Sequence, residues 1–572
     1  MSDVKKIPAF FDRRLFYALC LPVVAMISAL YNVFYQTNDD QAMRLILEGA
    51  LFSPEEPSEY VIFINIIYAR FLKYLYENFK NFFWYDFFFY ILTFISSCTI
   101  AYSLFVKNEK AALKILVTIF LFVSFRMAFN QIQFSIVAGI SACSATVVLI
   151  RLLFLPLSKK ETVFGLCYIP VALFLSSLVR PEMTGLTLFT GGALCLVSIG
   201  RIRFSKTFFA TVLSVTAGIA AVTGAYCHHR AEYAKVRPFD PLRYNDTKSR
   251  ILDKAVFHES RVKAEPYLAA AEPVLAENGW SRNDLELFLN RGFTGRGFFD
   301  QENIQRVADA VAPVLQGGFK ERYKLFFDDL PSCERYLHLI VLLMILFSKG
   351  KGVRFRMAAA HLIFLSVFLG LTAFFKPLPV RVYFSLNLLE FCFLVFLTGN
   401  DFGISNADET LNRLKSFTGI GFSGRKCARV LFAFLIGFVI WLYPAYVPYA
   451  NVFYDFYKNA ELPQTPDVPF VPSYYQLRGS ILPFRPFKAG VGNFLLAHSW
   501  TAATPAFQKQ INGDFYTLLM SGKVRFLDFY NHPTRAYHLI EQFWKEHYGK
   551  DCKIKTPEAP DNPNVMLYVD CR

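Results

Sequence analysis

Long apolar stretches recur along this chain of 572 residues, and they limit the folds open to it more than any other feature. Their length matches the ~20 residues with which a helix crosses a lipid bilayer. Because 54% of the residues are hydrophobic and only 18% are charged, a soluble protein of this size is excluded. We expect eleven spans, with the approximate bounds 15–36, 84–106, 112–130, 133–154, 162–179, 183–200, 204–226, 333–348, 357–375, 382–399 and 429–449.

The expected fold class is therefore an all-α polytopic membrane protein. Its first stretch, LFYALCLPVVAMISALYNVFYQ, is followed by no small-residue cleavage site, so we expect a retained first helix and no cleaved signal peptide. The eighth stretch, with the apolar core YLHLIVLLMILF, is short for a crossing. The transmembrane module would occupy residues 1–449, and a small C-terminal domain residues 450–572.

The basic residues are divided unevenly between two sets of connections. With the N-terminus in the cytoplasm, the cytoplasmic connections carry 22 Lys and Arg residues, and the short connections on the other side carry only Arg44, Arg126, Arg180, Lys376 and Arg381. Because connections rich in Lys and Arg stay in the cytoplasm, this asymmetry puts the N-terminus inside and the C-terminus outside. It also accounts for the net charge of +15, so we expect no nucleic-acid partner.

This topology exposes three larger segments on the outer face: residues 37–83, residues 227–335 and the tail. In the first, EYVIFINIIYARFLKYLYENF is apolar on one side and charged on another, which favours a helix lying flat at the interface. A span here would invert every later connection against the charge distribution. In the second, Ser281 followed by Asp284 predicts the start of a helix.

Four of the eleven cysteines fall on the outer side in this topology: Cys227, Cys333, Cys552 and Cys571. In an oxidising compartment, Cys552 and Cys571 would close a loop in the tail, and Cys227 with Cys333 is the other pairing to consider. The sequence leaves both pairings open. The chain has no CxxC pair and no cysteine spacing typical of a metal site.

Two adjacent carboxylates, Asp39 and Asp40, follow the first expected span in the stretch TNDDQAMRLILEG. One explanation is structural, because a helix dipole stabilises acidic residues in the first turn, with Thr37 or Asn38 as the cap and Gly49 as the C-terminal stop. The other is chemical. A carboxylate at the outer membrane boundary can take a proton from an acceptor hydroxyl, or hold a divalent cation such as Mg²⁺ or Mn²⁺. The two explanations are compatible.

A hydroxyl activated in this way would attack a sugar carried by polyprenyl phosphate, and the leaving phosphate needs fixed positive charge on the same side of the bilayer. Arg180 and Arg381 are the main candidates, because each lies beside a proline at a tight outward connection. Lys376 and Arg126 are secondary candidates. The structural alternative for each arginine is snorkelling at the end of a span. The chain has no P-loop, so we do not expect ATP-driven chemistry.

Together these features resemble the GT-C class of integral-membrane glycosyltransferases. The matching parts are TNDDQAMRLILEG, the flat helix before WYDFFFY and the outward C-terminal domain. More narrowly, residues 38–85 resemble the opening of poorly characterised bacterial membrane proteins linked to surface-glycan assembly, and YNDTKSRILD, GWSRNDLELF and KPLPVRV resemble later parts of the same pattern. The resemblance implies a bacterial inner-membrane enzyme with a polyprenyl-phosphate-linked sugar donor, and Asp39 or Asp40 as the catalytic or metal-holding carboxylate.

Three functions follow from these observations. The first is a glycosyltransferase that adds one sugar to a glycan, lipid or protein acceptor, and the second is a polysaccharide polymerase that uses lipid-linked oligosaccharides. The third is a transporter of lipid-linked sugars without chemistry of its own. A transporter is expected to carry charges deep within its spans, and the nearest approach to this is Arg126, in VSFRMAFN near a predicted span end. The sequence therefore favours the glycosyltransferase, without indicating the sugar, the acceptor or the stereochemical outcome.

Overall fold

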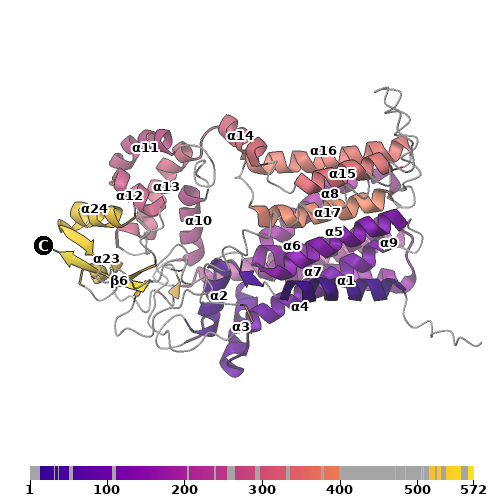
Figure 1. Ribbon diagram of the computed structural model, residues 1–572, viewed down its shortest axis with the longest axis horizontal. Helices are drawn as coiled ribbons and strands as arrows, with labels where there is room; N and C mark the ends of the chain where they lie inside the picture. Colours follow the sequence, from indigo (N-terminus) through magenta and orange to yellow (C-terminus); the bar gives the residue numbers. More distant parts are fainter. Residues whose placement is uncertain are drawn as a thin grey trace, which may run out of the picture.

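The structure, a computed structural model, has a bundle of long, nearly parallel helices and, at one end of it, an assembly of shorter helices and strands (Figure 1). The described residues are 13–30, 33–35, 38–50, 56–105, 111–202, 205–236, 240–253, 255, 264–289, 297–329, 335–348, 350–374, 379–398, 470–471, 483–484, 501, 504–505, 507, 514–521, 525–529, 536–555 and 564–571.

The bundle confirms the expected class of a polytopic helical membrane protein. Ten of the eleven expected spans coincide with helices, and the eleventh, 429–449, lies outside the described residues. Seven of the described helices are long and apolar enough to cross a membrane: α4, α5, α6, α7, α9, α16 and α17. The bundle helices are α1 (Arg13–Ala29), α4 (Trp84–Leu104), α5 (Ala111–Asn130), α6 (Phe134–Phe154), α7 (Lys159–Val179), α8 (Pro181–Leu196), α9 (Lys206–Tyr233), α15 (Arg335–Phe347), α16 (Lys351–Phe374) and α17 (Val380–Thr398).

The central helix of the bundle is α6. Within the apolar windows of the two helices, 89% of α6 is buried inside the protein but only 17% of α9, so α9 lies at the edge. Small residues let other helices approach α6 closely. A Cβ atom on Gly139 would lie 2.0 Å from Oγ of Ser385 in α17 and 3.1 Å from the terminal methyl group of Met183 in α8. Both helices therefore meet α6 at the same glycine.

The segments expected on one side of the membrane gather at one end of the bundle, which we call the loop end (Figure 1). Here the two-residue strand β1 (Phe34–Tyr35) pairs in parallel with β2 (Gln131–Ile132), directly before α6. Helix α2 (Asn38–Glu48) follows β1 and ends at Gly49, whose φ of 75° is the left-handed conformation favoured by glycine. The predicted stop is thus confirmed.

The amphipathic segment of the first loop forms α3 (Ile66–Asn78), which runs across the direction of the bundle helices (Figure 1). This is the orientation expected of a helix lying at the interface. Asn65 caps α3 and also donates a hydrogen bond from Nδ2 to the backbone carbonyl of Ala225 in α9. The backbone N–H of Ile66 donates to Nδ1 of His229 in the same helix. Helix α3 is therefore anchored to the end of α9.

The assembly at the loop end, called the end assembly below, combines the second loop with the described part of the tail. The loop contributes α10 (Pro241–Leu252), α11 (Glu265–Glu277), α12 (Arg282–Leu289), α13 (Gln301–Leu315) and α14 (Phe319–Asp329). The predicted helix start at Ser281 is confirmed, because its Oγ accepts from the N–H of Asp284 and the Asp284 carboxylate accepts from the N–H of Ser281. The boundary predicted at residue 450 lies outside the described residues.

The tail is mixed in structure. It contributes α23 (Phe515–Met520), α24 (Ala536–Tyr548) and a four-stranded sheet in the order β3 (Phe470–Val471), β4 (Arg525–Phe529), β6 (Asn564–Cys571) and β5 (Cys552–Lys555). Strand β3 is parallel to β4, and the other pairs are antiparallel. A disulfide joins Cys552 to Cys571 across β5 and β6, which confirms that pairing. Cys227 is a free cysteine, and Cys333 lies outside the described residues.

Candidate functional site

Asp40 lies in the first turn of α2, with its carboxylate fully buried at the loop end. Its Oδ1 accepts a hydrogen bond from the hydroxyl of Tyr85 at 2.8 Å and another from the backbone N–H of Phe134 at 3.0 Å. Phe134 is the first residue of α6, and the N–H groups of a helix N-terminus carry partial positive charge. The carboxylate of Asp40 therefore joins the first loop to the start of the central helix.

Asp39 differs from Asp40 in its access to water. It precedes Asp40 in the same first turn, but its side chain is only half-buried. Neighbouring residues of a helix point to different faces, which explains the difference. The carboxylate of Asp40 is thus engaged by other elements of the protein, and Asp39 is the more exposed member of the pair.

Arg180 connects α7 to α8 and lies over the aromatic ring of Phe134, the residue whose N–H binds Asp40. The guanidinium carbon is 4.9 Å from the ring centroid of Phe134 and 5.3 Å from that of Phe63, and the two rings stack on each other. Arg180 also pairs with the exposed carboxylate of Glu182 at 3.1 Å. One residue, Phe134, therefore contacts both Asp40 and one of the two main candidate arginines.

Arg381 lies in the first turn of α17 and is half-buried. Ser385, four residues later, meets Gly139 of α6, five residues after Phe134. At about 1.5 Å per helical residue, the start of α17 lies level with the start of α6. Met183 in the first turn of α8 meets the same glycine. The structure thus brings Arg381 to the end of the bundle where Arg180 lies.

Three helices therefore begin side by side at the loop end: α6 at Phe134, α8 at Pro181 and α17 at Val380. Helix N-termini attract anions, because their unpaired N–H groups and their dipoles point toward the ligand. Arg180 and Arg381 lie at two of these starts. These two starts are electrostatically suited to a phosphate, whereas the start of α6 already binds the carboxylate of Asp40.

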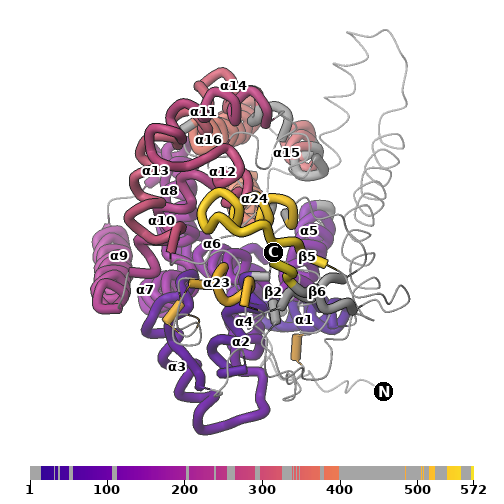
Figure 2. The backbone as a smooth tube through the Cα atoms, turned by 90° about the vertical axis from the view of Figure 1, so that its left-hand side faces the viewer, coloured from indigo at the N-terminus to yellow at the C-terminus, as the bar shows by residue number. Residues whose placement is uncertain are grey.

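Of the two secondary candidates, the structure describes only Arg126. Lys376 lies outside the described residues. Arg126 lines an apolar cavity of about 540 Å³ between α1 and α5, together with Tyr17, Val24 and Phe122. Figure 2 shows α1 and α5 on one flank of the bundle and α8 and α9 on the other. The residues around Phe134 do not line the cavity of Arg126.

A buried ionic network at the loop end was not predicted. Arg44, which the charge distribution assigned to the outer aqueous side, is completely buried, and its Nη1 lies 3.0 Å from Oδ2 of the equally buried Asp86 in α4. Tyr35 donates to Asp86 at 2.6 Å, and Nε of Arg44 lies 2.6 Å from Glu48. Burial raises the pKa of Glu48, although Arg44 acts in the opposite direction. From the tail, the backbone N–H of Phe484 also donates to Asp86.

A second unpredicted pair lies deep within the bundle. Nδ1 of His361, in the middle of α16, is 2.7 Å from Oε1 of Glu390, which is fully buried in the middle of α17. The ring of His338 in α15 lies 5.3 Å from that of His361. The lone Glu in the apolar run SLNLLEFCFLVF was the available signal. The prediction that Arg126 comes nearest to a deep charge is therefore wrong.

The acidic pair of α2 does not belong to a larger cluster of metal-binding side chains within the described ranges. The group of three that does come together, Asp284, Glu546 and His547, lies in the end assembly. At the acidic pair, Oδ1 of Asp40 is engaged by Tyr85 and Phe134, which suits a positioning residue better than a metal ligand.

Comparisons with known proteins find little. No protein-family model matches the chain, and no curated protein matches it. Among solved structures, the chain is similar to ArnT from Cupriavidus metallidurans bound to undecaprenyl phosphate, with a TM-score of 0.31 and 11% identity over 97% of each chain. A similarity of this size assigns the chain to no family.

Proposed function

We propose that this protein is a membrane glycosyltransferase, which moves a sugar from a polyprenyl-phosphate-linked donor to a glycan, lipid or protein acceptor. The observation that carries the proposal is the double contact of Phe134, whose N–H binds the Asp40 carboxylate and whose ring lies beneath Arg180. The helix α2, which carries the proposed base Asp39, and a cation for the leaving phosphate are therefore both held at Phe134. Sugar transfer from a lipid phosphate requires these two groups together.

In the proposed reaction, the carboxylate of Asp39 takes the proton of an acceptor hydroxyl. The hydroxyl oxygen bonds to the anomeric carbon of the donor sugar, and the bond from that carbon to the phosphate oxygen breaks. The electron pair leaves on the polyprenyl phosphate, whose charge Arg180, Arg381 and the N-termini of α8 and α17 stabilise. Asp40 positions α2 through Tyr85 and Phe134.

The direct test uses purified protein in detergent with a labelled polyprenyl-phosphate sugar. Release of polyprenyl phosphate by the wild type and its loss in Asp39→Asn support the proposal. Full activity in both Asp39→Asn and Asp40→Asn would contradict the site assignment. The same assay with a chelator shows whether transfer needs a divalent ion, and recovery with added Mg²⁺ or Mn²⁺ but not with Zn²⁺ would assign that ion to the acidic pair.

We place the reaction on the outer face of a bacterial inner membrane, with the N-terminus in the cytoplasm. The Cys552–Cys571 disulfide supports this side for the tail, because disulfides persist in oxidising compartments. A reporter enzyme that is active only outside the cytoplasm, fused to the C-terminus, is expected to be active. An inactive reporter, with an active cytoplasmic reporter at the same position, would reverse the orientation.

A transporter of lipid-linked sugars is the second candidate function, and the buried pair Glu390–His361 favours it. Ionisable residues deep within a bundle commonly mark transport or proton pathways. Flux of a labelled lipid-linked sugar into vesicles without chemical change, abolished in Glu390→Gln, would establish this function over the first. A polysaccharide polymerase would instead be recognised by long products in place of a single added sugar.

A further inference from the structure

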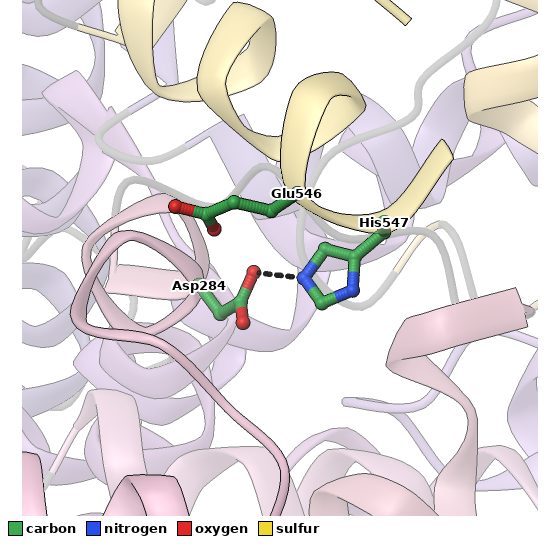
Figure 3. Close-up of side chains that lie close together, drawn as sticks. All are labelled: Asp284, Glu546 and His547. Atoms are coloured by element: carbon green, nitrogen blue, oxygen red, sulfur yellow. Dashed lines mark hydrogen bonds and ion pairs between the residues drawn. The ribbon is translucent and has the colours of Figure 1, made fainter. Parts of the chain in front are cut away.

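Three side chains with metal-binding chemistry meet in the end assembly. Asp284 belongs to α12, and Glu546 and His547 are neighbours near the end of α24 (Figure 3). One ligand atom from each residue lies within 4.8 Å of the others. The group thus combines an imidazole nitrogen with two carboxylate oxygens.

Asp284 is fully buried, and its two oxygens have different partners. Oδ2 accepts a hydrogen bond from the backbone N–H of Ser281 at 2.7 Å, which fixes the carboxylate at the start of α12. Oδ1 lies 2.8 Å from Nε2 of His547, as the dashed line in Figure 3 marks. A carboxylate held through one oxygen presents the other in a fixed direction, as supported metal ligands do.

The other two side chains are also positioned. The His547 ring lies 4.0 Å from the ring centroid of Phe298 and 4.6 Å from that of Phe543, and these rings limit its rotation. Glu546 is exposed, and its Oε2 accepts a hydrogen bond from Oγ of Ser281 at 2.8 Å. Ser281 therefore holds both carboxylates beside the imidazole.

We propose that Asp284, Glu546 and His547 form a binding site for a divalent metal ion of the zinc class. Zn²⁺ binds imidazole nitrogen and carboxylate oxygen at about 2.0–2.2 Å, usually with four ligands, so a water molecule or Ser281 completes the set. The imidazole disfavours Mg²⁺ and Ca²⁺, which take oxygen ligands. The ion displaces the proton between Asp284 and His547, whose ligand atoms then separate from 2.8 Å to about 3.4 Å.

The site would clamp the second loop to the tail, because Asp284 and His547 are 263 residues apart in the chain. A metal ion that binds only the folded assembly stabilises it by mass action. This inference is independent of the proposed transfer reaction, since none of the three residues contacts the site around Phe134 within the described residues.

For the test, metals are first removed from the purified full-length protein with a chelator. The binding of added Zn²⁺ is then measured. We expect about one tightly bound Zn²⁺ per chain in the wild type, and affinity reduced at least tenfold in His547→Ala and in Glu546→Gln. Matched controls are His538→Ala, an exposed histidine of the same helix, and Glu277→Gln, an exposed glutamate of α11. Both controls are expected to retain the ion.

Glu546 is on the surface, so Glu546→Gln keeps the test valid even if His547→Ala fails to fold. We also expect Zn²⁺ to raise the unfolding temperature of the wild type and of His538→Ala, but not of Glu546→Gln. Equal zinc binding by the wild type and both site variants would overturn the proposal. So would a preference of the wild type for Mg²⁺ over Zn²⁺.

Discussion

The guanidinium carbon of Arg180 lies 4.9 Å from the ring centroid of Phe134. Through its backbone N–H, the same phenylalanine binds the carboxylate of Asp40. The ring and the N–H belong to one residue but serve two different partners. A side-chain substitution at Phe134 therefore separates the contribution of the ring from that of the hydrogen bond.

We predict that Phe134→Leu keeps the backbone hydrogen bond to Asp40 but removes the cation–π contact that positions Arg180. A cation–π contact contributes about 0.5–2 kcal/mol, which corresponds to a two- to thirty-fold loss in kcat/KM. The measurement is sugar transfer with varied donor concentration, together with thermal unfolding. Unchanged kinetics in a folded variant would contradict a functional role for the Arg180 position.

Asp39→Asn and Asp40→Asn are predicted to lose transfer for different reasons. At Asp39 the base is removed, and the unfolding temperature should stay close to that of the wild type. At Asp40 the amide oxygen still accepts from Tyr85 and Phe134, but the charge at the α6 N-terminus is lost, which costs about 0.3–1 kcal/mol. Asp40→Ala leaves two buried donors unpaired and should cost about 1–3 kcal/mol for each. Thermal unfolding distinguishes these variants, and equal stability of all three would be inconsistent with the buried role of Asp40.

Removing one partner of the Arg44–Asp86 pair is predicted to destabilise the protein strongly. Both side chains are completely buried, and breaking such a pair costs about 3–5 kcal/mol. Arg44→Met and Asp86→Asn are therefore expected to lower the unfolding temperature sharply. Arg282→Met is the control, because water screens the ion pairs of that arginine at the surface, so its loss should lower the unfolding temperature much less. Similar effects at Arg44 and Arg282 would argue against the buried network.

Gly139→Ala is predicted to push α17 away from α6. The new Cβ would lie 2.5 Å from Cβ of Ser385, and such overpacking costs about 1–3 kcal/mol. The variant should also slow transfer, because the displaced helix carries Arg381. Ser385→Gly in the same chain should restore much of the loss. Gly185→Ala in α8 is the matched control, since no atom lies within 4 Å of its new methyl group; an equal loss there would refute the packing explanation.

The spans were predictable from sequence because the length and composition of an apolar run alone decide whether it can cross a bilayer, whatever other segments it packs against. The end of α2 at Gly49 and the start of α12 at Ser281 were predictable because helix ends also depend on residues close in the sequence. The burial of Asp40 was not, because it depends on Tyr85 and Phe134, which lie 45 and 94 residues away in the chain. The tail sheet depends likewise on pairings between distant strands.

Arg44 illustrates the limit of counting charges by position along the chain. The positive-inside rule assigns a side of the membrane, and it says nothing about burial within the protein. The partner that neutralises Arg44 begins the next expected span, in WYDFFFY, where an aspartate beside aromatic residues gave no local sign of pairing. Glu390 was the clearer signal, since a lone carboxylate in an apolar run needs a partner.

The most direct test of the account measures polyprenyl phosphate released in a single turnover from a panel of labelled polyprenyl-phosphate sugars. The wild type, Asp39→Asn, Arg180→Met and the double variant are compared. If both residues act on one donor, the wild type releases polyprenyl phosphate, each single variant is slow, and the double variant is hardly slower than the worse single variant. Absence of release by the wild type, or losses that multiply as for two independent sites, would contradict the account.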